Sequence, residues 1–266
     1  MKGTIRIWTT RLFATGLLIS GLILGIILNP GLLYANKTIV DNYIVYHSSP
    51  IDDDVIKRLE SVTMLLEQSE LYDASFKLYI CLNDGSYYPT LLEKVRGQAF
   101  AWGFYNKIVL QGDADFKNNS VQLNGYSWNS EQLIAHEAIH CYQYNMLGFW
   151  GSNPIANYPN WKWEGYPEYV SRQNMEQLNL YENIKRLMET TERDRNSWAI
   201  KFADGTISPV NYYQDWLLVS YCRDIKDLSY DELLNNSLTK ESVEKEMMEW
   251  FEIESKKRTH NKTYKQ

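Results

Sequence analysis

Histidine and cysteine are both scarce in this sequence: the 266 residues include four His and three Cys. The spacing of the Cys matches no metal-binding motif, and three Cys permit at most one disulfide, so a Cys-based zinc site or a disulfide-rich scaffold is excluded. We expect all three thiols to be buried as small apolar side chains. They are Cys81, Cys141 and Cys222.

The chain also lacks an excess of basic residues. Its net charge is −6 and its pI is near 5.4, whereas a nucleic-acid partner would require a basic face. We see no internal repeat and no low-complexity linker. Apolar residues make up 44% and aromatics 14%, which is typical of a folded chain long enough to bury a core.

Charge is absent from the 24 residues between Leu12 and Ala35. The apolar stretch within them predicts a transmembrane helix over about residues 12–29, because a hydrocarbon core of about 30 Å needs about 20 apolar residues at 1.5 Å each. Lys2, Arg6 and Arg11 precede it, and basic flanks favour the cytoplasmic side. Everything after residue 36 is then expected outside the cytoplasm.

Residues 1–35 fit two kinds of targeting segment. A cleaved signal peptide has a shorter apolar region and a small-residue cleavage site, and "LYA" before Asn36 is a passable one. The length of the apolar run favours an uncleaved signal anchor. A cleaved signal would leave a secreted protein. In either case we expect one domain over residues 36–258 and a polar tail over 259–266.

Hydrophobic periodicity and turn signals predict strands in the first half of the domain and helices in the second. This order is typical of the α+β class. Expected strands cover residues 42–49, 76–82 and 99–110, the last as one bent or two short strands. Expected helices cover 52–70, 88–98, 131–146, 161–174, 175–190, 211–225, 229–236 and 239–257, with a polar loop at 113–120 and a long loop at 148–160.

The stretch "LIAHEAIHCYQ" (133–143) carries the chemistry. On a helix capped by Asn129 or Ser130, His136 and His140 lie one turn apart and can present two imidazoles to one Zn²⁺. Glu137 is rotated by about 100°, so it suits a general base acting on water rather than a ligand. A chain of this composition is expected to contain about 0.004 such patterns by chance.

A catalytic zinc needs a third protein ligand. The remaining two His, at 47 and 260, are poorly placed, so the third ligand is expected to be a carboxylate. The stretch "NWKWEGYPEYVSRQ" (160–173) offers Glu164 and Glu168. Glu168 can alternatively form an exposed ion pair with Arg172 at i+4.

"HEAIH" followed by "W-E-G-x-x-E-Y" resembles the gluzincin metallopeptidases, which include thermolysin-like enzymes and zinc aminopeptidases; the resemblance is close over residues 129–173. It implies a zincin-like catalytic domain, in which a small mixed sheet and the active-site helix precede a mainly helical part. It also implies zinc-dependent hydrolysis of peptide bonds. Glu164 matches the third zinc ligand, and Glu168 matches a carboxylate that hydrogen-bonds a ligating His, here His136.

The same resemblance implies a phenol that stabilises the oxyanion and an edge strand that binds the substrate. "SPVNYYQDWLLVSYC" (208–222) offers Tyr212 or Tyr213 for the first, and residues 106–110 are the candidate for the second. The upstream segment "NGYSWNS" has one Gly, whereas aminopeptidases carry a Gly-rich segment there, so endopeptidase action is slightly favoured. Pro167 fits a helix that begins close to Trp163; if the helix begins at Pro167, Glu164 lies in a loop.

Two alternatives to an active enzyme remain. His136 and His140 can be buried core residues beside an ordinary Glu, or the domain can be an inactive zincin-like module that binds a peptide or a cell-surface partner. The presence of Glu137 favours the enzyme, because inactive relatives often lose the base. For the seven aromatic residues between 149 and 169 we favour packing of the loop over a substrate-facing wall.

Overall fold

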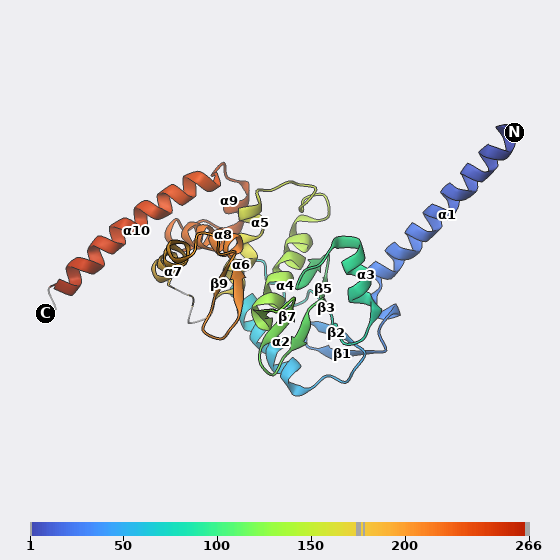
Figure 1. Ribbon diagram of the computed structural model, residues 1–266, viewed down its shortest axis with the longest axis horizontal. Coiled ribbons are helices and arrows are strands. Elements are labelled where there is room, and N and C mark those ends of the chain that lie inside the picture. Colours follow the sequence, from blue (N-terminus) through green and yellow to red (C-terminus); the bar gives the residue numbers. More distant parts are fainter. Residues whose placement is uncertain (1, 174–176, 178, 264–266) are drawn as a thin grey trace.

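The computed structural model describes residues 2–173, 177 and 179–263. It combines a small mixed sheet with helices, as the α+β prediction requires. A long helix projects from each end of the folded body: the first from the side of the sheet and the last from the helical side (Figure 1).

The N-terminal helix α1 (Lys2–Leu28) contains an apolar, solvent-exposed stretch, Arg11–Leu28, that by length and composition can cross a membrane. The chain then enters the domain within two residues, because Pro30 is already buried in a short 3₁₀ turn, Pro30–Leu32. The Tyr88 hydroxyl donates to the carbonyl of Ile27 at 2.6 Å. The end of α1 is therefore fixed directly to the body of the protein.

The main sheet has the order β1-β2-β3-β5-β4. Its three inner strands are parallel, and the two outer strands are antiparallel to their neighbours. The strands are β1 (Asn36–Val40), β2 (Tyr43–His47), β3 (Leu78–Cys81), β4 (Ala101–Phe104) and β5 (Lys107–Leu110). Residues 99–110 thus form two short strands, and the inner strand of that hairpin is β5.

Alternation along the inner strands gives the sheet two apolar faces, which different helices cover. Ile80 and Ile108 point into the large core beneath α2 (Asp53–Leu66) and α4 (Ser130–Leu147). Cys81 and Val109 point to the opposite face, where they pack with Leu92 of α3 (Tyr87–Arg96). Cys141 and Cys222 lie in the larger core, and all three thiols are buried and free, as expected.

A second sheet, whose first part was expected to be a polar loop at 113–120, leads into α4. Its strands β6 (Asp113–Asp115), β7 (Ser120–Leu123) and β8 (Tyr126–Asn129) are joined by tight turns. Asn124 and Gly125 both have positive φ, as a two-residue hairpin turn requires. The prediction of a loop holds for residues 116–119, which form a turn, and is wrong at 113–115 and 120. β7 and β8 do alternate, with Val121 and Trp128 paired and buried, but strands of three or four residues are too short for that period to stand out.

The second half is helical apart from a short hairpin, β9 (Ala199–Lys201) and β10 (Ile207–Pro209), that the sequence did not indicate. Its helices are α5 (Asn160–Trp163), α6 (Gly165–Ser171), α7 (Leu180–Arg193), α8 (Val210–Ser220) with a π turn (Tyr221–Ile225), α9 (Tyr230–Asn235) and α10 (Lys240–Thr263). The expected helix at 175–190 begins later, and residues 174–176 and 178 of these predictions lie outside the described residues. Residues 259–263 belong to α10 rather than to a tail, and 264–266 are not described.

The cap of α4 was predicted correctly. The side-chain oxygen of Asn129 accepts a hydrogen bond from the backbone N–H of Gln132 at 3.1 Å. We expect Asn129→Ala to lower the free energy of unfolding by about 1 kcal/mol, because it removes this bond at the start of a buried helix. Urea unfolding of the full chain in detergent micelles measures the change. Asn129→Asp keeps an acceptor and is the matched control; equal losses in both variants would contradict the capping role.

Candidate metal centre

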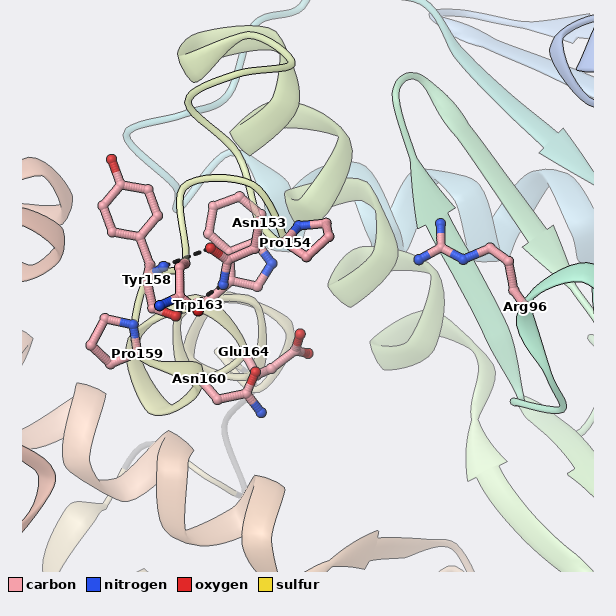
Figure 2. A pocket seen from close by; sticks show the side chains of 9 residues that line it. Arg96, Asn153, Pro154, Tyr158, Pro159, Asn160, Trp163 and Glu164 are labelled. Atoms are coloured by element: carbon pink, nitrogen blue, oxygen red, sulfur yellow. Dashed lines mark hydrogen bonds between the residues drawn. The ribbon is translucent and has the colours of Figure 1, made fainter.

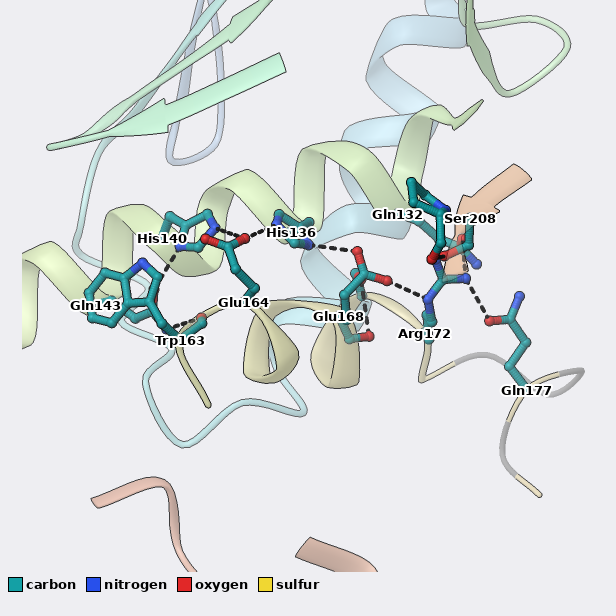
Figure 3. A network of polar contacts seen from close by, with 12 residues as sticks. Gln132, His136, His140, Gln143, Trp163, Glu164, Glu168, Arg172, Gln177 and Ser208 are labelled. Atoms are coloured by element: carbon teal, nitrogen blue, oxygen red, sulfur yellow. Dashed lines mark hydrogen bonds and ion pairs between the residues drawn. The ribbon is translucent and has the colours of Figure 1, made fainter. Parts of the chain in front are cut away.

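The two His of the motif lie side by side on α4. Both side chains are buried, and their ring centroids are 4.9 Å apart. The i, i+4 spacing places both on the face of α4 that meets α6. Both rings turn toward Glu164 (Figure 3).

Glu164 brings a carboxylate to both imidazoles. Its Oε2 atom is 3.5 Å from Nε2 of His136 and 3.2 Å from Nε2 of His140. Ligands at about 2.0–2.1 Å from one tetrahedral ion lie about 3.3 Å apart, so these separations fit Zn²⁺. Among the described residues, these three form the one group of His, Cys and carboxylate side chains close enough to hold a metal ion.

The backbone around Glu164 explains how it reaches the histidines. Glu164 is the junction between α5 and α6 and has helical angles, φ −85° and ψ −33°. Pro167 is the third residue of α6, in the first turn, where the missing N–H costs little. A side chain at Gly165 would meet the Asp215 carbonyl oxygen of α8 at 2.7 Å, so glycine permits close packing there. The helical backbone thus begins before Glu164, and the Glu164 side chain points toward the two His instead of lying in a loop.

Glu168 has both of the roles that the sequence left as alternatives. Its Oε1 atom is 3.0 Å from Nδ1 of His136, and its Oε2 atom accepts from Nε of Arg172 at 2.6 Å. The pair is not exposed: Glu168 is 1% and Arg172 2% accessible. The guanidinium also lies between the rings of Phe202 and Trp216. This buried pair holds His136 so that Nε2 faces Glu164.

Gln143 holds His140 through a hydrogen bond that the sequence did not predict. Nδ1 of His140 is 2.8 Å from Oε1 of Gln143, whose amide nitrogen donates to the Trp163 carbonyl and the Tyr230 hydroxyl. Because the amide nitrogen is occupied as a donor, Oε1 must accept, and His140 carries its proton on Nδ1. Its Nε2 lone pair is then free for a metal. The i, i+3 spacing from His140 was the available signal.

Charge around the two imidazoles is unbalanced without a cation. Three carboxylates, Glu137, Glu164 and Glu168, lie there with one compensating guanidinium, Arg172. With both His neutral, three charges of −1 and one of +1 sum to −2. One divalent cation would compensate this charge; without a metal, protonation of His136, whose pKa is raised, compensates part of it.

The pKa values of these groups reflect the same imbalance. Burial lowers the pKa of His136, but Glu164 and Glu168 outweigh it and raise the value to about 10. Burial raises the pKa of Glu168, but Arg172 and His136 outweigh it and lower the value to about 2. The pKa of Glu164 also lies below its usual range, because the two imidazoles outweigh its burial. The carboxylates therefore remain ionised and can act as ligands or acceptors.

Glu137 lies next to His136, His140 and Glu164, the trio of candidate ligands, but does not belong to it. Burial raises the pKa of its carboxyl, with His136 and His140 opposing the shift. A side chain at Gly103 of β4 would come within 2.4 Å of the Glu137 carbonyl oxygen and 2.8 Å of Oε2. The edge of the sheet thus touches α4 at this residue. Glu137 and Gly103 line one cavity of about 170 Å³ together with the trio.

Of the two candidate tyrosines, the structure brings one to the site. Tyr212 lines the same cavity, and its ring centroid is 6.0 Å from that of His136. Burial and the neighbouring carboxylates Glu164 and Glu137 raise the pKa of its phenol, which therefore stays a protonated donor. Tyr213 does not reach the site: it is fully buried, with its hydroxyl 3.4 Å from the Asn183 carbonyl oxygen. Adjacent residues on a helix point about 100° apart.

The expected edge strand was also misplaced. Residues 106–110 contain β5, which lies between β3 and β4, whereas β4 pairs on one side only within the described part of the chain. The Gln111 N–H donates to the Phe100 carbonyl, so the backbone polar groups of Phe100 face β5. Because this orientation alternates along an antiparallel strand, those of Ala101 and Gly103 face the open side. This open edge faces the cavity. The sequence showed the hairpin but not the order of its strands.

A larger hollow of about 670 Å³ adjoins the cavity and shares Arg96, Asn153, Trp163 and Glu164 with it. Asn153 of the long loop and Asn160 at the start of α5 line the side opposite Arg96 (Figure 2), and Asn157 also lines the hollow. The aromatic residues of 149–169 mostly pack, as favoured: Tyr158 stacks on Trp163, which stacks on His140. Phe149 and Trp150 instead are exposed.

The other two His are not part of the group. His47 ends β2 and contacts the Thr38 hydroxyl and the Ser49 carbonyl, and His260 belongs to α10. Comparisons of the chain with protein-family models, curated proteins and solved structures found no match. The functional interpretation therefore rests on the geometry of the site.

The trio predicts that metal binding depends on Glu164. Glu164→Ala removes one of three ligands and should abolish tight binding, whereas the wild type should hold about one Zn²⁺ per chain. Elemental analysis of the full chain in detergent micelles measures both. Glu60→Ala, which removes an exposed carboxylate on α2, is the control. Zinc retained at full strength by Glu164→Ala would show that another group is the third ligand.

The contact between Glu168 and His136 predicts a second, smaller effect. Glu168→Gln should weaken zinc binding about 10- to 100-fold, because the charged carboxylate that orients His136 and raises its basicity becomes a neutral amide. Competition with a coloured chelator measures the affinity. Unchanged affinity would mean that the buried pair with Arg172 stabilises the fold without supporting the ligand.

Proposed function

We propose that this chain is a zinc metallopeptidase of zincin-like fold that hydrolyses peptide bonds. The observation that supports this most is the arrangement of His136, His140 and Glu164. One carboxylate oxygen lies 3.5 Å from Nε2 of His136 and 3.2 Å from Nε2 of His140. Nδ1 of His140 is hydrogen-bonded to Gln143, and Nδ1 of His136 lies 3.0 Å from a carboxylate oxygen of Glu168. Such a set suits Zn²⁺ better than Mg²⁺ or Ca²⁺, which prefer oxygen ligands.

A bound Zn²⁺ would supply Lewis acidity, which activates water and polarises a carbonyl. The chain's own residues then move the protons. Glu137, buried at the wall of the cavity, accepts the proton of the attacking water and passes it to the leaving amine. Tyr212 remains protonated and donates a hydrogen bond to the oxygen that becomes negative.

The open edge of β4 supports a peptide as the substrate. Strand addition uses backbone groups that every peptide has, and Ala101 and Gly103 present theirs beside Glu137. Recognition of this kind gives broad specificity. The hollow continues past Glu164 on one side, so an extended chain has room beside the reacting bond. Endopeptidase action stays a prediction from the single Gly of the segment upstream of the motif.

The location proposed for this activity is outside the cytoplasm. The basic residues Lys2, Arg6 and Arg11 favour an N-terminus in the cytoplasm, with α1 as a single membrane span and the domain on the other side. Cleavage of the first 35 residues would release the same domain as a secreted enzyme.

The role of Glu137 separates an enzyme from a domain that only binds peptides. Glu137→Gln should lower peptide hydrolysis by about 10²- to 10⁴-fold, because the amide cannot accept the proton, and should leave zinc content near that of the wild type. Hydrolysis of casein by the full chain in detergent micelles provides the measurement. A zinc-loaded wild type as inert as the variant would support the binding module instead.

The two tyrosines provide a matched pair. Tyr212→Phe should lower kcat by about 10²- to 10³-fold with little change in KM, because it removes a donor that acts in the transition state. Tyr213→Phe removes the same hydroxyl one residue further on and should leave kcat near the wild-type value. Steady-state kinetics on one peptide substrate decides between them, and equal effects would exclude the assignment.

A further inference from the structure

Arg96 occupies a distinctive place beside the candidate site. It is the last residue of α3, and its side chain lines both the cavity that holds His136, Glu137 and Glu164 and the adjoining hollow. Among the described residues that line these two spaces, it is the one Lys or Arg. Figure 2 shows it reaching toward the hollow from the side opposite Asn160 and Glu164.

One contact holds the guanidinium in place, and a second fixes the aromatic ring beneath it. It lies over the ring of Trp102 with its central carbon 4.5 Å from the ring centroid, and the Trp102 indole N–H donates to the carbonyl of Gly97, the next residue after Arg96. Within the part of the chain that the structure describes, Arg96 forms no ion pair with a carboxylate. Its fork of N–H donors therefore faces the hollow without an acidic partner.

The direction of the edge strand places Arg96 relative to a bound peptide. β4 runs from Ala101 to Phe104, and Glu137 lies beside Gly103. A peptide added antiparallel to β4 runs the opposite way, so residues after the reacting bond pass Ala101 and then Ala99. Arg96 lies at that end, with the amide side chains of the long loop opposite.

We propose that Arg96 selects a carboxylate on the C-terminal side of the cleaved bond. The guanidinium binds a carboxylate through two parallel hydrogen bonds, a geometry that neither a lysine nor an amide offers. The carboxylate is either an Asp or Glu side chain or the free C-terminus of a short peptide. This inference rests on the proposed peptidase function and names the substrate class of that same site.

The test uses a library of synthetic decapeptides with randomised residues, prepared once with free C-termini and once as C-terminal amides. The full chain in detergent micelles with Zn²⁺ cleaves the library, and mass spectrometry identifies the bonds cut. In parallel, the inert variant Glu137→Gln is used to capture peptides from the same libraries, which measures binding without turnover. Each experiment is repeated with Arg96→Gln, with Arg96→Glu and with Lys94→Gln, an exposed cation two residues away that lines neither space.

We expect cleaved and captured peptides to be enriched about tenfold or more in a carboxylate after the cleaved bond. Arg96→Gln should lose the enrichment, Arg96→Glu should shift it toward Lys and Arg, and Lys94→Gln should keep it. Enrichment of Asp and Glu in both libraries identifies a side chain as the source. Enrichment confined to the library with free C-termini identifies the terminal carboxylate.

Cleavage without carboxylate enrichment, or enrichment that survives Arg96→Gln, would overturn the role of Arg96 and leave the peptidase function standing. Arg96-dependent capture without any cleavage would have the opposite meaning: the carboxylate site would stand and the proposed peptidase function would fail. Neither capture nor cleavage would exclude both.

Discussion

The buried negative charge beside α4 is the constraint to which the rest of the site responds. Three carboxylates and one guanidinium surround two buried imidazoles at the wall of the cavity. Such a group is stable only when its charge is compensated and its polar atoms have partners, and each surrounding element supplies part of that. α6 brings Glu164 and Glu168, Arg172 is enclosed by two aromatic rings, and Gln143 connects His140 to α5 and α9.

This constraint also explains the packing between helices. α6 carries two site carboxylates four residues apart, so it must approach both α4 and α8 closely, and Gly165 permits the contact with α8. On the other side, Gly103 lets the edge of the sheet touch α4 at Glu137. The two glycines have the same function at two different contacts, β4 against α4 and α6 against α8: each removes a side chain where a backbone must come within contact distance.

The sequence predicted the parts of this site that depend on local spacing. His136 and His140 share a helical face, Asn129 caps that helix, and the Glu-Gly pair at 164–165 marks where the carboxylate approaches.

The sequence could not predict the features that depend on how the elements are arranged in the tertiary structure. The position of β4 at the edge follows from how the hairpin joins the sheet, and Tyr213 was not separable from Tyr212 without the orientation of α8. The β6-β7-β8 sheet was missed because its strands are only three or four residues long, although β7 and β8 alternate and Asn124-Gly125 is a typical hairpin turn between them.

The direct junction between α1 and the domain limits which substrates the cleft can contact. α3 holds the end of α1 through Tyr88 and ends at Arg96, eight residues or about 12 Å further along its axis. With α1 in a bilayer, the cleft would stay at a fixed height above the lipid surface, set by a rigid helix instead of a flexible tether. Encounters would then occur by diffusion in two dimensions. Partners tethered to the same surface would meet the cleft far more often than molecules free in solution, and only those whose extended segment lies at the matching height would fit.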